Sequence, residues 1–177
     1  MLYRLSAAWA KIELGCAAFL ALGVTVLILL NVVTRTAGNA LFWVDELAIY
    51  TMAWMTFLGA SASLHYRTAV AITLLPDALP PRARAVILKT VDAMVFAFAL
   101  MMVWFCWRWF MPLELFRAGL DTIAFQGTTF NFIYAEPTST LGVPKYLFWL
   151  VMWLFALGAT LHSAMHLLRP PLSEPGA

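Results

Sequence analysis

The amino-acid sequence predicts an all-α integral membrane protein with four transmembrane helices and a short interfacial amphipathic helix. Of its 177 residues, 63% are hydrophobic and 11% are charged, whereas a soluble domain is closer to half apolar and a quarter charged. The hydrophobic residues also fall into four long runs, each of about the length that crosses a bilayer. The chain therefore needs lipid as its solvent, and we expect residues 1–177 to form a single membrane domain.

The first expected span covers residues 14–33 and the second covers residues 47–64. The first run follows two basic residues and so resembles a signal peptide. It is, however, long enough to cross a membrane, and we expect it to be retained. The second run begins just after Asp45 and Glu46, whose negative charges suit the positive end of a helix dipole. These two spans are therefore expected to form a hairpin with a short connection.

The third expected span covers residues 91–111 and is ended by Pro112, and the fourth covers residues 146–168. Residues 80–90 combine a proline pair with interleaved basic and apolar side chains, which predicts a short helix lying in the membrane interface. Residues 112–144 form the longest polar stretch of the chain. This stretch is the segment expected to make an extramembrane surface.

The basic residues predict the orientation of the chain, because Lys and Arg accumulate in loops that stay in the cytoplasm. On one expected side lie Arg4, Lys11, Arg67, Arg82, Arg84, Lys89 and Arg169, and on the other lie Arg35, Arg117 and Lys145. Arg108 is close to the outer boundary of the third span and can extend toward it. We therefore expect a multi-pass protein with both termini in the cytoplasm and with residues 112–144 facing outward.

Several functional classes are disfavoured by the composition. The net charge of +2 is small and the basic residues are scattered, which argues against a nucleic-acid partner. Cys16 and Cys106 lie inside apolar runs and outside any Cys-x-x-Cys pair, so packing is their expected role. A nucleophile, a base and an oxyanion-stabilising group do not converge in the sequence, so a free-standing membrane enzyme is the weakest hypothesis. We predict no catalytic residue, no metal and no cofactor.

His162 and His166 are four residues apart and share one face of the fourth span. Two such histidines can hold a haem iron, and His65 at the inner end of the second span is the third histidine of the chain. A haem-binding membrane anchor of an electron-transfer complex is therefore the alternative functional hypothesis. The interpretation that we favour is a polar helix end at the membrane interface.

Charged residues also meet at the outer end of the first two spans. Asn31 and Arg35 lie on one face of the first span, and Asp45 and Glu46 begin the second across a short loop. We expect an ion pair between Arg35 and Glu46, because a charge at the membrane edge is costly unless it is paired or hydrated. The alternative is a solvated turn in which these charges have no partner.

Three short motifs in a fixed order carry a resemblance to a known family. They are Asn31-x-x-x-Arg35, Trp43-x-x-Glu46 and Trp54-x-x-Phe57-Leu58-Gly59-Ala60. This pattern resembles the small membrane subunit of tripartite ATP-independent periplasmic (TRAP) transporters, the DctQ-like family. The four-span plan, the total length and the basic segment that follows the proline pair extend the resemblance over nearly the whole chain.

The resemblance implies a scaffold, or accessory permease, subunit of a sodium-coupled secondary transporter in the bacterial inner (cytoplasmic) membrane. In this family the small subunit holds a large, DctM-like membrane subunit, and a periplasmic substrate-binding protein delivers a small organic anion for symport. A scaffold role agrees with the sequence, in which no span is interrupted near its middle as the helices of a transport site often are. The structural or interface residues that we expect are Asn31, Arg35, Trp43, Asp45, Glu46, Trp54, Phe57 and Gly59.

Overall fold

The computed structural model describes residues 1–68 and 79–168 of the chain. Within these residues the protein is built of helices, which are α1 (Leu2–Thr36), α2 (Phe42–Tyr66), α4 (Pro81–Phe110), α5 (Pro112–Arg117), α6 (Thr122–Thr129), α7 (Tyr146–Trp149) and α8 (Val151–Leu168). Four helical segments are long and apolar enough to cross a membrane, namely α1, α2, α4 with α5, and α7 with α8. The predicted all-α membrane fold with four spans is confirmed.

Two helices begin earlier than the apolar runs that predict them. Helix α1 starts at Leu2, and its 35 residues correspond to about 50 Å, well beyond the hydrocarbon thickness of about 30 Å. Helix α4 starts at Pro81, so the segment expected as a separate interfacial helix is continuous with the third span. The boundary expected near residue 91 is not a break in the helix, because neither Gly nor Pro interrupts the chain from Arg82 to Phe110.

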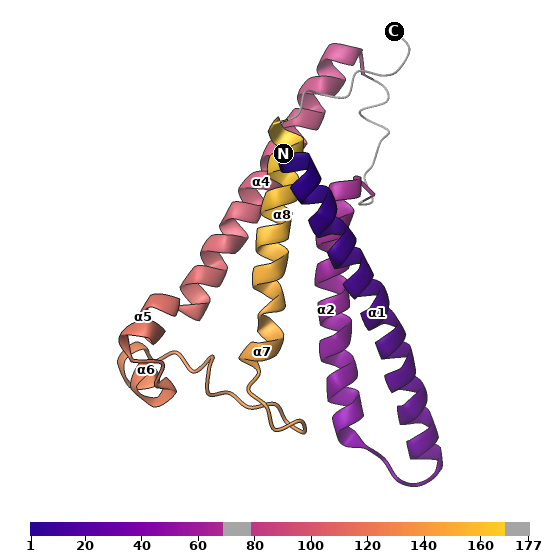
Figure 1. The fold of residues 1–177 in the computed structure, drawn as a ribbon, viewed down its shortest axis with the longest axis vertical. Coiled ribbons are helices and arrows are strands. Elements are labelled where there is room, and N and C mark those ends of the chain that lie inside the picture. Colours follow the sequence, from indigo (N-terminus) through magenta and orange to yellow (C-terminus); the bar gives the residue numbers. More distant parts are fainter. Residues whose placement is uncertain (69–78, 169–177) are drawn as a thin grey trace.

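The four spans converge at one end of the molecule and spread apart toward the other (Figure 1). Helices α1 and α2 form an antiparallel hairpin, and α8 packs against α1, α2 and α4. The converging end carries the start of α1, the end of α2 and the end of α8 (Figure 1). We call this the inner end, and we call the end with the α1–α2 loop and helix α6 the outer end.

Two apolar cores hold the helices together. The first lies where α8 meets the α1–α2 hairpin and contains Ala17, Leu58 and Val151. The second lies at the outer end, where Phe110, Phe125 and neighbouring aromatic side chains bring α6 against α4 and α8. Burial of such aromatic side chains supplies a large apolar contact area. The outer ends of α4 and α8 are therefore joined through α6.

The expected outward loop contains regular structure. Helix α4 ends at Met111, whose backbone is left-handed (φ 43°), and Pro112 then begins α5. Helix α6 is capped by Asp121, whose carboxylate accepts hydrogen bonds from the backbone N–H groups of Ile123 and Ala124 at 2.8 and 3.2 Å. A side-chain cap of this kind satisfies backbone donors that a helix start otherwise leaves unpaired. Residues 112–129 thus form a small helical cap at the outer end.

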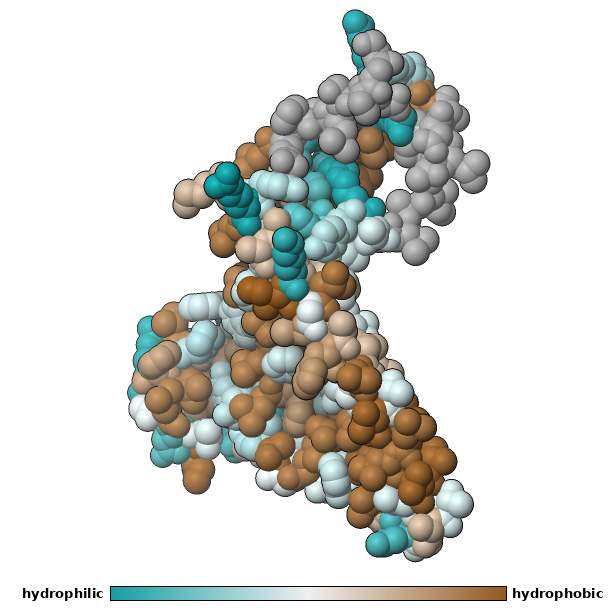
Figure 2. Space-filling view, turned by 45° about the vertical axis from the view of Figure 1, so that its right-hand side comes forward, coloured by the Kyte–Doolittle hydropathy of each residue, from teal (hydrophilic) through white to brown (hydrophobic). Residues whose placement is uncertain are grey.

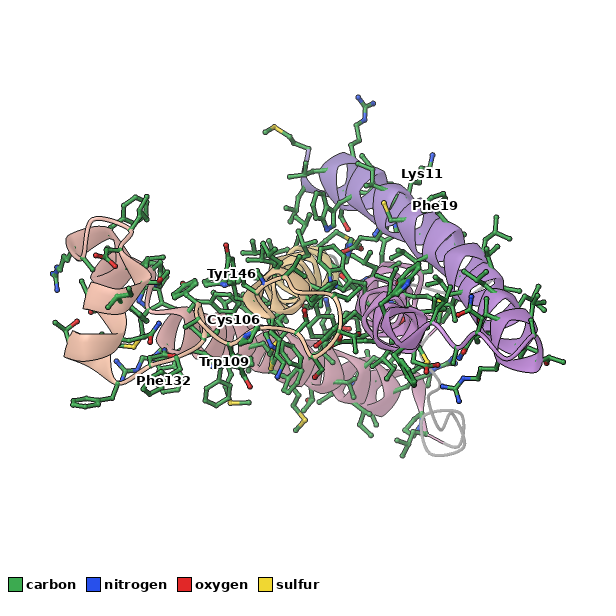
Figure 3. All side chains as sticks on the ribbon, turned by 90° about the horizontal axis from the view of Figure 1, so that it is seen from below. Lys11, Phe19, Cys106, Trp109, Phe132 and Tyr146 are labelled. Atoms are coloured by element: carbon green, nitrogen blue, oxygen red, sulfur yellow. The ribbon has the colours of Figure 1, made fainter. Side chains whose placement is uncertain are left out.

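The outward faces of the spans are apolar. Brown, hydrophobic residues cover much of the surface toward the outer end in Figure 2, whereas hydrophilic residues gather nearer the inner end. Phe19 lies on the side of α1 that faces away from α2 and α8, as does Lys11, whereas Cys106 lies between α4 and α8 (Figure 3). Phe19 is 74% exposed. Such a surface is stable against lipid or against another apolar protein surface.

Candidate functional site

The polar residues at the outer end of α1 and α2 form a closed cluster of Asn31, Arg35 and Asp45, which we call the outer cluster. The Asp45 carboxylate accepts hydrogen bonds from the Asn31 amide and from the Arg35 guanidinium. Arg35 Nε also donates to Asn31 Oδ1 at 2.8 Å. The expected ion pair between Arg35 and Glu46 was therefore wrong, since Arg35 pairs with Asp45. Asp45 and Glu46 are adjacent in a helix, so their side chains point about 100° apart, and Asp45 faces α1 whereas Glu46 does not.

Glu46 instead binds the backbone of a distant loop. Its carboxylate accepts hydrogen bonds from the N–H groups of Ser139 (2.8 Å), Thr140 (2.6 Å) and Leu141 (3.2 Å), and from the Thr140 hydroxyl (2.6 Å). Gly142 follows with a left-handed backbone (φ 69°), which glycine adopts without steric cost. Successive N–H groups in such a turn form a concave anion-binding surface, and here Glu46 occupies it.

The loop that Glu46 holds is the tip of a short hairpin formed by residues 136–145. Across its base, the backbone N–H of Lys145 donates to Glu136 O, and Lys145 Nζ donates to the Glu136 carboxylate at 2.9 Å. This hydrogen bond raises the pKa of Lys145, which therefore keeps its charge at neutral pH. Nearby, burial raises the pKa of Tyr134, whose hydroxyl donates to Phe110 O at 2.6 Å. The hairpin is thus anchored to both α2 and α4.

Two of the expected structural residues join α2 to the fourth span. Trp54 Nε1 donates a hydrogen bond to the backbone oxygen of Phe148 at 2.8 Å. The ring of Phe57 packs edge-on against Phe155, with ring centroids 5.4 Å apart. Both aromatic residues therefore hold α7 and α8 in place.

Of the two remaining expected residues, Trp43 is exposed and Gly59 is partly exposed. Trp43 is 39% exposed at the outer start of α2. A Cβ atom built on Gly59 would meet no atom within 4 Å among its non-local neighbours in the described chain. The exposed part of Trp43 and the open space beside Gly59 are available to a neighbouring protein or to lipid.

Near the inner end, four polar side chains meet in the interior, and we call them the buried polar cluster. Ser6 and Glu13 come from α1, His65 from α2 and His162 from α8. Ser6 Oγ lies 2.7 Å from His65 Nδ1 and 2.7 Å from His162 Nδ1. His162 Nε2 lies 3.0 Å from Glu13 Oε2. The cluster therefore links three membrane-spanning helices through hydrogen bonds.

This cluster is almost completely shielded from solvent. Ser6 and His162 are 0% exposed, Glu13 is 2% exposed and His65 is 8% exposed. Trp9 Nε1 donates a further hydrogen bond to Glu13 Oε1 at 2.8 Å. An ionisable group this deep in an apolar bundle is costly unless it is paired, which marks the cluster as a site with a specific role.

Gly158 of α8 makes room for the cluster. A Cβ atom at this position would collide with Glu13 Oε1 and Ser61 Oγ, and would lie 2.9 Å from Trp9 Nε1. The absence of a side chain thus allows the carboxylate to approach the backbone of α8. Ser61 Oγ is the one buried side-chain polar atom of the described residues that lacks a hydrogen-bond partner.

The ring of His162 is enclosed by three helices near the inner end and is fully buried, and its position at the membrane interface stays a prediction. Both of its ring nitrogens are used, one by Ser6 and one by Glu13. His166 Nε2 donates to the backbone oxygens of Leu64 and His65, and its Nδ1 accepts from Arg67 Nε at 3.1 Å. These contacts leave no ring nitrogen of either residue directed at a haem iron. Among the described residues, no three His, Cys, Asp or Glu side chains are placed to hold a metal ion.

A second set of charges ties α4 to the inner end. The Arg67 guanidinium donates to both oxygens of Asp92 at 2.9 Å. Lys89, which is 3.9 Å from the same carboxylate, donates to the backbone oxygens of His166 and Leu167. The last carbonyls of a helix need such partners, and Lys89 supplies them for α8.

Ser6, Glu13, Ser61 and Gly158 were not predicted as site residues from the sequence. The uninterrupted apolar run begins at Leu14, which suggests that Glu13 lies outside the membrane, whereas the helix begins at Leu2. The signal that could have found the cluster is Glu13 itself, since it is the single acidic residue of α1. An isolated carboxylate within a membrane helix is usually paired with another polar or charged group inside the bundle.

Comparison with known proteins gives one family and one curated relative. The family model described as "Tripartite ATP-independent periplasmic transporters, DctQ component" matches residues 24–170. A provisionally assigned TRAP transporter small permease protein of Haemophilus influenzae is 33% identical over 85 residues. This alignment covers 48% of the chain and 52% of the relative, so the chain matches about half the length of that protein. No solved structure matches the chain significantly.

The family match and the geometry concern the same parts of the molecule. The matched residues include the outer cluster, Glu46 with its hairpin, and His162, whereas Ser6 and Glu13 precede them. The match covers the second, third and fourth apolar spans and the outer part of the first. The chain belongs to the DctQ family of small membrane subunits of TRAP transporters, which are permease subunits and not enzymes.

Proposed function

We propose that the chain is the accessory subunit of a sodium-coupled TRAP transporter and holds a large, DctM-like membrane subunit in place. The observation that carries this proposal is that the described helices are fastened to one another at both ends while their outward faces remain apolar. Glu46 fastens the outer end, and Glu13 and Asp92 fasten the inner end. A subunit that is internally fixed and apolar outside is suited to support a partner that moves.

The contact with the large subunit is proposed on the exposed apolar faces of α1 and α4. Phe19 of α1 and Trp104 of α4 are 74% and 57% exposed. Trp43 of α2 is exposed and Gly59 has open space beside it, and both are proposed as further interface positions. Large aromatic side chains give much contact area with little conformational freedom to lose, which suits a permanent interface.

The proposed location is the bacterial inner membrane, with both termini in the cytoplasm. This orientation is supported by the basic residues, which are more numerous at the inner end than at the outer end. The helical cap and the hairpin then face the periplasm. Phe116 and Ile123 of the cap and the adjacent Phe130 are exposed, and we propose that this surface helps to dock a periplasmic binding protein that delivers a small organic anion.

The function is tested by purifying the tagged chain from its own membranes in mild detergent. The expected result is a large polytopic membrane protein that co-purifies in constant ratio with the chain. Proteoliposomes containing this complex are expected to take up an organic anion only when the binding protein and an inward sodium gradient are both supplied.

An untagged chain is the control for co-purification, and a potassium gradient of the same size is the control for coupling. A visible haem spectrum together with co-purifying redox proteins would overturn the proposal in favour of an electron-transfer anchor. Uptake that is equal in sodium and in potassium would refute the sodium coupling alone.

The orientation is tested by cysteine labelling in intact spheroplasts. In a chain carrying Cys16→Ala and Cys106→Ala, Thr128→Cys on α6 is expected to react with a membrane-impermeant maleimide added from outside. Thr128 is exposed in the structure, so access does not require unfolding. Arg82→Cys at the inner end is the matched control and is expected to react only after permeabilisation. The opposite pattern would place the termini outside.

A further inference from the structure

The hydrogen bonds of the buried polar cluster fix how its protons can be arranged. The Ser6 hydroxyl lies 2.7 Å from the Nδ1 atoms of both His65 and His162. It has one proton and can donate to only one of them. The other ring must therefore carry a proton on Nδ1 and donate it to Ser6. The contact between His162 Nε2 and Glu13 Oε2 needs one more proton, on either atom.

Two protonation states of the cluster, which differ by one proton, satisfy these requirements. With both rings neutral and Glu13 ionised, all three hydrogen bonds form, but the four side chains carry one net negative charge. Adding one proton makes the cluster neutral and also allows all three bonds to form. The added proton can reside on Glu13, on His162 or on His65, and it passes between these places when the Ser6 hydroxyl reverses its direction.

Burial favours the neutral arrangement. Glu13, Ser6 and His162 are at most 2% exposed, and an ionised carboxylate in such surroundings is costly unless a charge compensates it. The indole N–H of Trp9 donates to the carboxylate without adding a charge. One proton shared within the cluster supplies the compensation.

The other charged groups near the cluster are engaged elsewhere. Facing the ring of His65 are Tyr3 of α1 and His166 of α8, with ring centroids 5.8 and 6.5 Å away. Arg67, at the end of α2, is bonded to Asp92 of α4 and to His166. The remaining ionisable groups at this end of the bundle include Tyr66, next to His65, and Lys89, which is bonded to the end of α8. On α1 and just before it they are the amino group of Met1, Arg4 and Lys11, which are exposed, and Lys11 faces outward (Figure 3).

We propose that Ser6, Glu13, His65 and His162 form a proton-binding site that holds one proton at neutral pH. His65 is the most exposed of the four and is the end at which the proton enters from solvent and leaves. Binding forms one N–H or O–H bond with a proton taken from water and transfers no electrons. Ser61 Oγ, which lies on the same side of Gly158 as Glu13 Oε1 and has no partner, is a spare donor for the carboxylate when the proton is released.

The test measures proton occupancy directly in the full chain, labelled with ¹⁵N at histidine and placed in lipid nanodiscs. The chain has only three histidines, and His166→Gln assigns the third. Near neutral pH we expect one of two signatures, namely a doubly protonated ring at His65 or His162, or an infrared band of a protonated carboxyl group. Raising the pH should remove that signature in a single step.

Glu13→Gln is expected to abolish both signatures, because no carboxylate then remains to be compensated. Glu114→Gln, which alters a more exposed carboxylate on α5, is the matched control and should leave them unchanged. Two neutral rings together with an ionised carboxylate in the wild-type chain at neutral pH would overturn the proposal. The wild-type spectra decide the question even if Glu13→Gln does not fold.

Discussion

Replacing Glu13 by alanine is expected to reduce the stability of the folded chain by about 3–5 kcal/mol, the range for breaking a buried charged pair. The substitution removes the partner of His162 Nε2, which is buried, and of Trp9 Nε1, which is partly buried. Unfolding of the chain in mixed detergent micelles, followed by loss of tryptophan fluorescence, measures the change.

Two further variants show whether this loss comes from the unpaired partner. Lys11→Ala lies on the outward face of the same helix (Figure 3) and is expected to change stability by less than about 0.5 kcal/mol. The double variant Glu13→Leu with His162→Leu is expected to recover part of the loss, because it leaves neither a buried carboxylate nor a buried imidazole without its partner. A Glu13→Ala chain as stable as the Lys11→Ala chain would show that the pair does not hold the helices together.

Replacing Gly158 by alanine is expected to destabilise the chain by about 1–3 kcal/mol, the usual range for overpacking a close-packed interior. The added methyl group would lie 2.9 Å from Trp9 Nε1 and would collide with Glu13 and Ser61. Glu13 cannot move aside without losing its bonds to His162 and Trp9. The same unfolding experiment measures the effect.

The matched control for this variant is Gly59→Ala. Both glycines lie in the interior of a membrane-spanning helix, but no non-local atom lies within 4 Å of a Cβ at Gly59. There alanine is expected to be neutral or to stabilise the helix by about 0.5–1 kcal/mol. If the two variants behave alike, the close contact at Gly158 does not constrain the packing.

The sequence was sufficient to predict the four spans, because long apolar runs in a chain so poor in charge have few other solutions. It did not locate the first helix start, since Leu2 to Glu13 is polar enough to read as a flank although it continues the helix. Hydropathy reports which residues can lie in lipid and not where the backbone hydrogen bonding begins.

The site was harder to predict because its contacts join residues far apart in the chain. Asp45 and Glu46 are chemically similar neighbours, and only the position of the hairpin tip determines that Glu46 turns toward Thr140 while Asp45 turns toward Arg35. Glu13 and His162 are likewise brought together by the packing of α8 against the first two helices. Local spacing, such as the four residues between Asn31 and Arg35, was informative where the partners share one helix.

The hydrogen bonds of the Glu46 carboxylate also limit the distance between the outer starts of the second and fourth spans. The carboxylate holds the chain at Thr140, and α7 begins at Tyr146, so the six steps along the chain between these two residues can span at most about 20 Å. While that anchor holds, the outer start of the fourth span cannot move farther than this from the outer start of the second. Glu46 therefore acts as the fixed end of a short tether, which limits how widely the mouth of the bundle can open.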